Sequence, residues 1–263
     1  MYFIGVSTQK SSSMRVFPEW AEILGLGDCE LVGVDFKPHD KPDRYRAVVE
    51  WIKDQPLAFG ALVTTHKLDI YAAASDCFDH VDPLAAELGE VASIYKRGGK
   101  LCARAVDPHT SGLALEAFLP EEHWRDHPEA EVLILGAGGS ALGMVWNLLQ
   151  SDPTAARPRR IVVGNRSQAR LDHLREMSSH WGGESIVSTA LTARPEMSDA
   201  LLQELAPRSL VINATGLGKD APGSPLTDDA QFPEGGFVWE FNYRGDLLFL
   251  KQARNQSEER QLT

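Results

Sequence analysis

The sequence has few cysteines and no long apolar run. Its three cysteines, Cys29, Cys77 and Cys102, form neither a CxxC pair nor a Cys/His spacing typical of zinc. We therefore expect no metal, and free thiols in a reducing cytoplasm. No stretch approaches the roughly 18 apolar residues that span a bilayer, and the N-terminus lacks the basic and apolar regions of a signal peptide. These absences predict a cytoplasmic protein without a membrane partner.

An excess of basic charge is also missing. The chain carries 26 Lys and Arg residues against 37 Asp and Glu residues, for a formal net charge of −11. Since nucleic-acid binding needs a basic stripe, we expect no nucleic-acid partner. Hydrophobic residues make up 43% of the 263 residues, enough for a packed core in one large domain or two ordinary ones. The sequence leaves a monomer or a homodimer open.

Apolar and amphipathic segments alternate along the first hundred residues. Near-continuous apolar runs predict strands, separated by helices, at 2–6 (strand), 17–26 (helix), 30–36 (strand), 42–53 (helix) and 58–64 (strand). Two β-prone runs then flank Gly98-Gly99, which is typical of a β-hairpin. A helical stretch at 109–119 leads into the polar, proline-bearing segment 120–131, where the composition changes most clearly.

A second alternation follows that segment. Strands are predicted at 131–139, 160–165, 184–188, 209–215 and 236–242, with helices at 140–150 and 167–181. Strands spaced by helices of this length indicate βαβ units in a doubly wound parallel sheet. We expect a two-domain α/β fold with an α/β domain over 1–108, a Rossmann-type domain over 109–245, and a C-terminal helical segment over 246–263 that could return to the first domain.

The run VLILGAGGSALG is typical of a dinucleotide site. Gly136 would end the strand in a tight turn, Gly138 would let the backbone approach a phosphate, and Ala141 is the small third residue of the pattern. Gly139 and Ser140 lie where the next helix starts, and N–H groups there would face a pyrophosphate. The alternative is an ordinary structural glycine turn.

The end of the next strand favours NADP over NAD. NAD sites carry an acidic residue there for the ribose hydroxyls, but this chain has Asn165, Arg166 and Ser167. Arg166 could pair with a 2′-phosphate and stack on adenine, and Arg170 lies about one helical turn further on. The alternative is a solvated arginine at a helix start, where the helix dipole disfavours a cation.

The motifs GAGGSA, GNRSQAR and LVINATGLG, in a chain whose nucleotide fold comes second, resemble the shikimate dehydrogenase family, which includes quinate and aminoshikimate dehydrogenases. The match runs from about residue 4 to residue 253. It implies a substrate-binding first domain and an NADP-binding second domain. It also implies that Asn213 and Thr215 contact the cofactor, although this stretch could be only a strand-to-loop turn.

The resemblance assigns substrate and catalytic residues as well. Ser11 and Ser13 fall on the two serines that hydrogen-bond the substrate carboxylate in the family, and Tyr243 falls on a family tyrosine near the substrate. In an extended loop, residues at i and i+2 point the same way, so both hydroxyls could face one carboxylate. Lys67 and Asp107 fall on the catalytic lysine and aspartate.

Ketone reduction needs a hydride donor and an acid for the nascent alkoxide, which suits this pair. Lys67 could supply the proton, and Asp107 could orient the lysine and accept a hydrogen bond from a substrate hydroxyl. The alternatives are a solvated lysine and a helix-capping aspartate. His66 and His109 lack a second ligand at metal spacing, so we expect exposed or capping histidines.

The sequence departs from the family pattern around the substrate. Ala92 and Ala105 replace asparagines, Lys10 and Met14 replace a histidine and a proline, and the family's C-terminal helix has no counterpart before Thr263. The prediction is an NADP-dependent oxidoreductase of aromatic amino acid biosynthesis that interconverts a ring ketone and an alcohol on a shikimate-like cyclic hydroxy acid. The lost amides favour a less hydroxylated or bulkier substrate. A quinate or aminoshikimate dehydrogenase, or an NADP-binding sensor without turnover, remains open.

Overall fold

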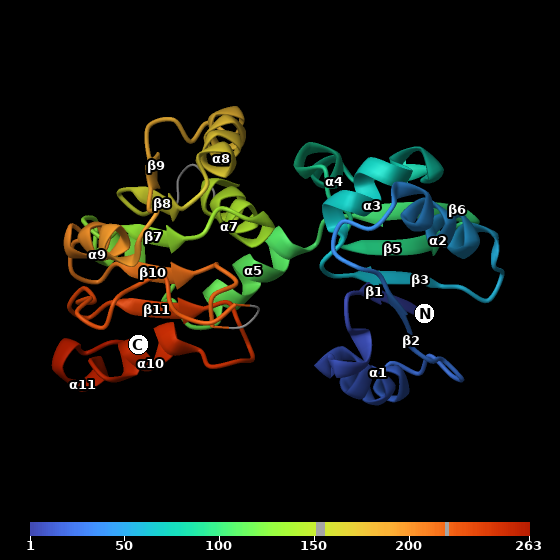
Figure 1. Ribbon diagram of the computed structural model, residues 1–263, viewed down its shortest axis with the longest axis horizontal. Coiled ribbons are helices and arrows are strands. Elements are labelled where there is room, and N and C mark those ends of the chain that lie inside the picture. Colours follow the sequence, from blue (N-terminus) through green and yellow to red (C-terminus); the bar gives the residue numbers. More distant parts are fainter. Residues whose placement is uncertain (151–155, 219–220) are drawn as a thin grey trace. The chain divides into compact units, whose positions relative to one another are not determined.

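The computed structural model describes residues 1–150, 156–218 and 221–263. The chain forms two compact units, Met1–Val106 and Asp107–Thr263, each built around its own sheet (Figure 1). The predicted fold class is confirmed: a mixed sheet lies in the first unit and an all-parallel, Rossmann-like sheet in the second. Among the described helices, none is long and apolar enough to cross a membrane.

The first unit contains a six-stranded sheet in the order β2-β1-β3-β5-β6-β4. The strands are β1 (Tyr2–Gly5), β2 (Val32–Asp35), β3 (Gly60–Val63), β4 (His80–Val81), β5 (Ser93–Arg97) and β6 (Lys100–Arg104). Strand β1 pairs in parallel with β2 and β3, whereas β5 runs antiparallel to β3 and β6. The predicted hairpin is confirmed: Gly98 and Gly99 have φ values of 59° and 76°, as a two-residue turn between twisted strands requires.

The first unit contains four α-helices, not all of which pack against its sheet. They are α1 (Ser12–Ile23), α2 (Pro42–Asp54), α3 (Lys67–Ala74) and α4 (Pro83–Leu88), with 3₁₀ turns at Thr8–Lys10 and Ser75–Cys77. Val49 and Ile52 of α2 and Ile70 of α3 are fully buried in one core cluster with Ile4 and Ile94 of the sheet. This core fixes the ends of β3 and β5, near which Lys67 and Ala92 lie.

The second unit contains a five-stranded parallel sheet in the order β11-β10-β7-β8-β9. The strands are β7 (Val132–Leu135), β8 (Ile161–Asn165), β9 (Val187–Leu191), β10 (Leu210–Asn213) and β11 (Phe237–Glu240). All four residues of β7 are buried, because helices cover both faces of the sheet (Figure 1). The order runs outward from β7 to β9 and then returns through β10, so a topological switch point lies at the carboxyl end of β7.

The helices of the second unit connect these strands and extend to the C-terminus. They are α5 (Asp107–Glu116), α6 (His123–Asp126), α7 (Gly139–Gln150), α8 (Gln168–His180), α9 (Pro195–Gln203), α10 (Leu248–Arg254) and α11 (Ser257–Arg260). Residues 246–263, for which the sequence left a return to the first domain open, lie in this second unit. The chain end is tied to it because Val238 N–H donates to the Thr263 carbonyl and Thr263 N–H donates to the Gly236 carbonyl.

Candidate functional site

A cavity of about 470 Å³ opens at the carboxyl edge of the second sheet. Because parallel strands present their carboxyl ends at one edge, the loops after β7, β8, β9 and β10 all contribute to its wall. The lining includes Gly136, Ala137, Gly138, Asn165, Arg166, Arg170, Thr192, Ala193, Arg194, Ser198, Ala214, Thr215 and Gly216. It therefore surrounds the switch point, the position at which doubly wound sheets bind their ligands.

The two glycines of the turn after β7 have different surroundings: at Gly136 the backbone packs too closely for a side chain, whereas Gly138 faces open space. Gly136 has φ +114°, and a Cβ there would lie 2.6 Å from the Ala214 carbonyl oxygen. At Gly138 the nearest atom to an added Cβ is Arg170 Nη1, 3.8 Å away, so the bare backbone faces open space beside an arginine. Ala141 is fully buried in α7, where its small side chain permits close packing. This cradle fits a pyrophosphate at the N-terminus of α7.

The remaining predicted cofactor residues of this region divide into two groups. Asn165, Arg166 and Arg170 line the cavity. Gly139 and Ser140 do not line it but form the first turn of α7, and Ser167 is the N-cap of α8, whose side chain makes no capping hydrogen bond. The Asn165 amide instead donates to the Ser167 carbonyl across 3.4 Å, which ties the end of β8 to the start of α8.

The charge of the lining is of one sign. Its charged side chains are Arg166, Arg170 and Arg194, and none of the described residues of the wall is acidic. This donor set fits a ligand with several negative charges, since guanidinium groups bind phosphate oxygens through paired hydrogen bonds. The residues therefore fit a phosphorylated dinucleotide better than an uncharged ligand.

A buried network holds the loop after β10. Asn213 Oδ1 accepts from Thr215 N–H (3.0 Å) and from the Thr215 hydroxyl (2.7 Å), while its amide donates to Glu240 Oε2 (2.8 Å). Glu240 Oε1 accepts from the N–H of Asn242, whose amide donates to the Thr215 and Leu217 carbonyls. Asn213 is fully buried and does not line the cavity, so it positions Thr215, which does.

Sequence reasoning did not identify Glu240, although its position at the end of strand β11 was a usable signal. Burial raises the pKa of its carboxyl group, against the hydrogen bonds from Asn242 and Asn213, which lower it. The network thus carries an acid that resists ionisation at the base of the loop.

The predicted substrate serines adopt a different local structure from the one expected. The sequence suggested an extended loop, but helix α1 begins at Ser12, and Ser11 is its N-cap. The Ser11 hydroxyl accepts a hydrogen bond from Ser13 N–H (3.2 Å), a capping contact that stabilises the first turn. The expectation that i, i+2 spacing aligns the two hydroxyls is therefore wrong, because Ser13 already lies in the helix.

The other residues assigned by the resemblance lie at element ends. Lys67 is the first residue of α3, and its carbonyl accepts from Val91 N–H (3.1 Å). Asp107 is the first residue of α5 and of the second unit. Tyr243 follows β11 and is 65% exposed. Each lies beyond the carboxyl end of a strand, since α3 follows β3 and α5 follows β6.

The two alanines that replace family asparagines are buried. The Ala92 carbonyl accepts from Val63 N–H and its N–H donates to the Arg104 carbonyl, both at 2.9 Å, so the backbone bridges the ends of β3 and β6. Its side chain is 1% exposed, and that of Ala105 is fully buried. Neither side chain adds a polar group to its surroundings.

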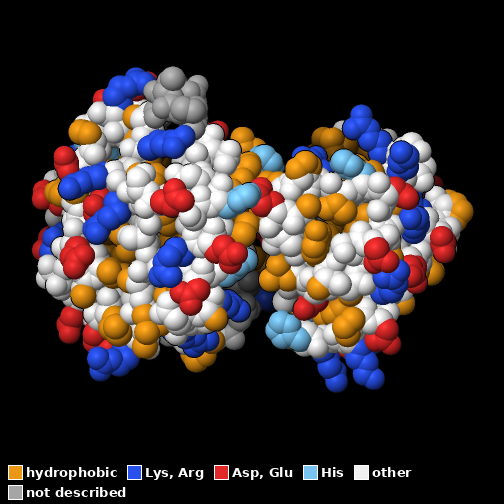
Figure 2. All heavy atoms as spheres, turned by 90° about the horizontal axis from the view of Figure 1, so that it is seen from above, with side chains coloured by type: hydrophobic (Ala, Val, Ile, Leu, Met, Phe, Trp, Pro, Cys, Tyr) orange, Lys and Arg blue, Asp and Glu red, His pale blue; other side chains and the backbone are white. Residues whose placement is uncertain are grey.

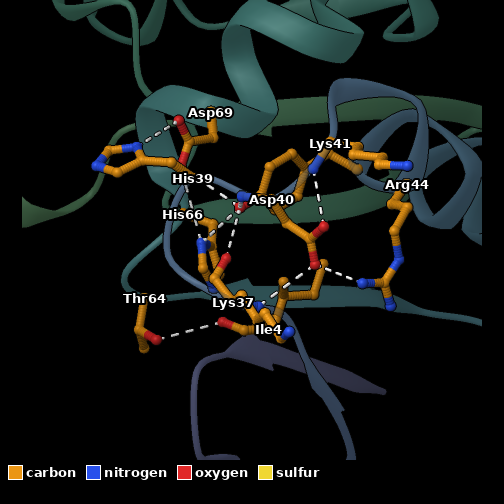
Figure 3. A network of polar contacts seen from close by, with 10 residues as sticks. Ile4, Lys37, His39, Asp40, Lys41, Arg44, Thr64, His66 and Asp69 are labelled. Carbon is orange, nitrogen blue, oxygen red and sulfur yellow. Dashed lines mark hydrogen bonds and ion pairs between the residues drawn. The ribbon is translucent and has the colours of Figure 1, made fainter.

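His66 was expected to be exposed or capping. It is not exposed, and although it occupies the N-cap position of α3, its side chain makes no capping hydrogen bond. The side chain is fully buried, and its Nδ1 lies 2.9 Å from the Tyr45 hydroxyl (Figure 3). That hydroxyl accepts from Asp40 N–H (3.0 Å) and lies near the Lys37 carbonyl (3.3 Å) and an Asp69 oxygen (3.5 Å). His66 Nε2 is buried without a hydrogen-bond partner in the described part of the chain. This burial could not be predicted from the sequence, because Tyr45 lies on another helix, α2.

Cofactor phosphates rather than metals suit the donor groups of this structure. Within residues 1–150, 156–218 and 221–263, no group of three or more His, Cys, Asp or Glu side chains is placed to hold a metal ion. The three cysteines are free thiols.

The fold places the chain among two-unit α/β proteins whose second unit is Rossmann-like. No family model matches it. Shikimate dehydrogenase (NADP(+)) of Brucella abortus (strain S19) is 26% identical over 223 residues, which make up 84% of this chain and 67% of that protein. The predicted resemblance is confirmed: over most of its length the chain is similar, at low identity, to proteins of the shikimate/quinate dehydrogenase family.

Solved structures agree on the fold. The crystal structure of shikimate dehydrogenase from Aquifex aeolicus matches with a TM-score of 0.72 at 19% identity, covering 97% of this chain and 82% of that one. Quinate dehydrogenase from Corynebacterium glutamicum, in complex with NAD, matches with a TM-score of 0.70 at 17% identity, covering 97% and 84%. The fold of the family therefore extends along nearly the whole chain.

Proposed function

We propose that this chain is an NADP-dependent dehydrogenase that interconverts a ring ketone and an alcohol on a small cyclic hydroxy-carboxylic acid similar to shikimate. The observation that carries the proposal is the arginine-lined cavity at the switch point of the second sheet. Arg166 stands there in place of the acidic residue typical of NAD sites. The Brucella relative, a shikimate dehydrogenase named for NADP(+), supports both the reaction and the cofactor.

The second unit would bind the cofactor through main-chain and cationic groups. The turn at Gly136 and Gly138 would hold the pyrophosphate, and Arg166 and Arg170 would bind the 2′-phosphate. Thr215, held by Asn213, would contact the nicotinamide end. A bound dinucleotide supplies the hydride in this chemistry, and the protein supplies its orientation.

Lys67 and Asp107 would perform the proton chemistry. A lysine ammonium can donate a proton to an alkoxide oxygen as that oxygen gains negative charge, and it can stabilise the charge before the transfer. A carboxylate such as that of Asp107 can accept a hydrogen bond from a substrate hydroxyl and fix the orientation of the ring. In the direction of alcohol oxidation the same groups would take the proton away.

The first unit would bind the substrate and set its class. Ser11 and Ser13 would bind the carboxylate, and the resemblance also assigns Tyr243 to the substrate. The Ser13 hydroxyl remains a candidate donor, whereas the Ser11 oxygen also accepts the capping hydrogen bond. Because Ala92 and Ala105 present buried methyl groups, a ring hydroxyl beside them would lose a partner, at a cost of about 1–3 kcal/mol. We therefore propose a substrate with fewer hydroxyls or more bulk than shikimate.

One assay tests the proposal against its two alternatives. NADPH formation is followed spectrophotometrically with shikimate, quinate, aminoshikimate and less hydroxylated cyclic acids, each with NADP⁺ and with NAD⁺. Turnover with NADP⁺ on a less hydroxylated acid is the expected result. Turnover that requires NAD⁺ and quinate would replace the proposal with a quinate dehydrogenase. Tight NADP⁺ binding without turnover on any acid would indicate a sensor.

A further inference from the structure

A third arginine, outside the GNRSQAR motif, lines the same cavity. Arg194 lies in the loop between β9 and α9, and together with Thr192 and Ser198 it forms the wall next to Arg166 and Arg170. Neither the family motifs nor the sequence analysis points to this residue. Its position in the wall raises the question of what a third cation contributes to the site.

Arg194 differs from most arginines of the second unit because its side chain has no partner among the described residues. Arg159, Arg160 and Arg175 form ion pairs with Glu129, Glu131 and Asp172. Acidic and basic side chains are interspersed over the surface of this unit in the same way (Figure 2). By contrast, the side chains of Arg166, Arg170 and Arg194 form no hydrogen bond or ion pair with any described residue. The net charge of the chain is −11, yet these three arginines, unpaired among the described residues, make the wall of this cavity positively charged.

The backbone fixes where Arg194 emerges. Strands β8 and β9 are parallel with Asn165 opposite Leu191, and Thr192 N–H donates to the Asn165 carbonyl (2.8 Å). The residues that follow both strands, including Arg166 and Arg194, therefore leave the sheet at the same edge.

The conformation of Arg194 is also set locally. It is the N-cap of α9 and is extended, with φ −135° and ψ 151°, as a residue before proline prefers. Its side chain makes no capping hydrogen bond. The guanidinium therefore does not stabilise the start of α9 and is available to bind a ligand.

We propose that Arg194 binds the phosphorylated ribose at the adenosine end of the cofactor and raises selectivity for NADP over NAD. This inference rests on the proposed function. Adenosine in a doubly wound sheet lies beyond the strand that follows the glycine turn, which here is β8, beside the β9 loop. A 2′-phosphate carries close to two negative charges, so a third guanidinium can form hydrogen bonds that Arg166 and Arg170 leave unfilled. NAD lacks this phosphate and offers Arg194 no such partner.

The test measures binding without turnover. Isothermal titration calorimetry gives the Kd of NADP⁺, NAD⁺ and adenosine 2′,5′-bisphosphate for wild type, Arg194→Ala and Arg194→Lys. Arg254→Ala is the matched control, because Arg254 is exposed in the same unit, lies outside the cavity, and its side chain forms no hydrogen bond or ion pair with the described residues. It changes the net charge by the same amount.

We expect Arg194→Ala to raise the Kd of NADP⁺ and of the bisphosphate by about tenfold or more, because a charge-assisted hydrogen bond is lost. The Kd of NAD⁺ should stay within about twofold of the wild-type value. Arg194→Lys should lie between wild type and Arg194→Ala, since lysine keeps the charge but not the paired donors. Arg254→Ala should match wild type.

Other outcomes overturn the inference separately from the proposed function. Equal weakening of NADP⁺ and NAD⁺, or no more weakening than Arg254→Ala produces, would remove Arg194 from the phosphate site while leaving an NADP dehydrogenase intact. A wild-type chain that binds NADP⁺ no better than NAD⁺ would overturn the cofactor assignment itself, and this inference with it.

Discussion

The two units differ in how their candidate residues are held. In the second unit, loops after four parallel strands meet at one cavity, and the predicted ligand contacts are backbone groups and unpaired arginines. In the first unit, Ser11 caps a helix and Ala92 presents a buried methyl group. A cofactor site made of backbone groups is retained when the sequence changes, because it requires only glycines at the turn and the same strand order. Substrate contacts depend on individual side chains, and a single substitution removes them. The cofactor end of a distant relative is therefore easier to recognise than the substrate end.

The sharpest way to break this contrast is to remove Lys67. If the first unit acts on substrate and the second holds the cofactor, Lys67→Ala should lower kcat by about 10²–10⁴-fold, the usual loss on removing a general acid. The Kd of NADP⁺ should not change. Steady-state kinetics and calorimetry measure the two quantities on the same preparations. Asp107→Ala should give the same pattern although Asp107 is the first residue of the second unit, because its proposed partner is the substrate and not the cofactor.

Lys100→Ala, in the exposed hairpin of the same unit, is the matched control for the loss of one lysine. Turnover near the wild-type value in Lys67→Ala would exclude this residue as the acid. A loss of NADP⁺ affinity equal to the loss of kcat would contradict the division of roles between the units.

A second variant tests the opposite half of the contrast. Arg166→Ala should weaken NADP⁺ by about 10–100-fold, as expected for hydrogen bonds to a charged group, and should weaken NAD⁺ much less. With saturating NADP⁺ its kcat should stay near the wild-type value. Fluorescence titration of both cofactors checks the ratio, and an equal effect on both would show that Arg166 does not read the phosphate.

Regular elements were predictable where apolar periodicity decides structure. The runs at β7, β8 and β10 are buried on both faces, and Gly98-Gly99 allows only a tight turn, so these assignments needed no tertiary information. The sequence predicted that the first helix starts at residue 17, but α1 starts at Ser12, because the Ser11 hydroxyl caps it. A run of serines is more often part of a loop.

Features that depend on distant contacts could not be read from the sequence. His66 is buried because a tyrosine from α2 reaches it, and the role of Glu240 depends on the amide of Asn213 on a neighbouring strand. Arg194 shares a wall with Arg166 only because β9 pairs with β8. No periodicity encodes these pairings, whereas the GxGxxA spacing encodes its own local geometry.

The network around His66 offers a test of stability in the first unit alone. Tyr45→Phe removes the hydroxyl that partners His66 Nδ1 and Asp40 N–H, and both groups lie in a buried or half-buried place. We expect a loss of about 1–3 kcal/mol in the free energy of unfolding, the cost of unpaired buried polar groups. Urea denaturation measures it, with NADP⁺ affinity unchanged.

Tyr95→Phe is the control, because the Tyr95 hydroxyl has no hydrogen bond within the described residues. It should stay within about 0.5 kcal/mol of wild type. Equal losses in the two variants would mean that the His66 network contributes nothing specific.

The smallest effect is expected at the base of the second unit's cavity loop, where Glu240 gives a pH signature. Burial raises the pKa of its carboxyl group in the folded chain, so the folded state binds more protons than the unfolded one above the ordinary pKa of 4.5. The stability that Glu240 contributes is complete below that value and is lost as the pH rises through the folded pKa. Relative to Glu240→Gln, which does not titrate, the free energy of unfolding of wild type should fall as the pH rises above the ordinary pKa of 4.5. Glu234→Gln, which replaces an exposed carboxylate of the same unit, is the matched control. A wild-type advantage that grows with pH would mean that the hydrogen bonds from Asn213 and Asn242 outweigh the burial of the charge.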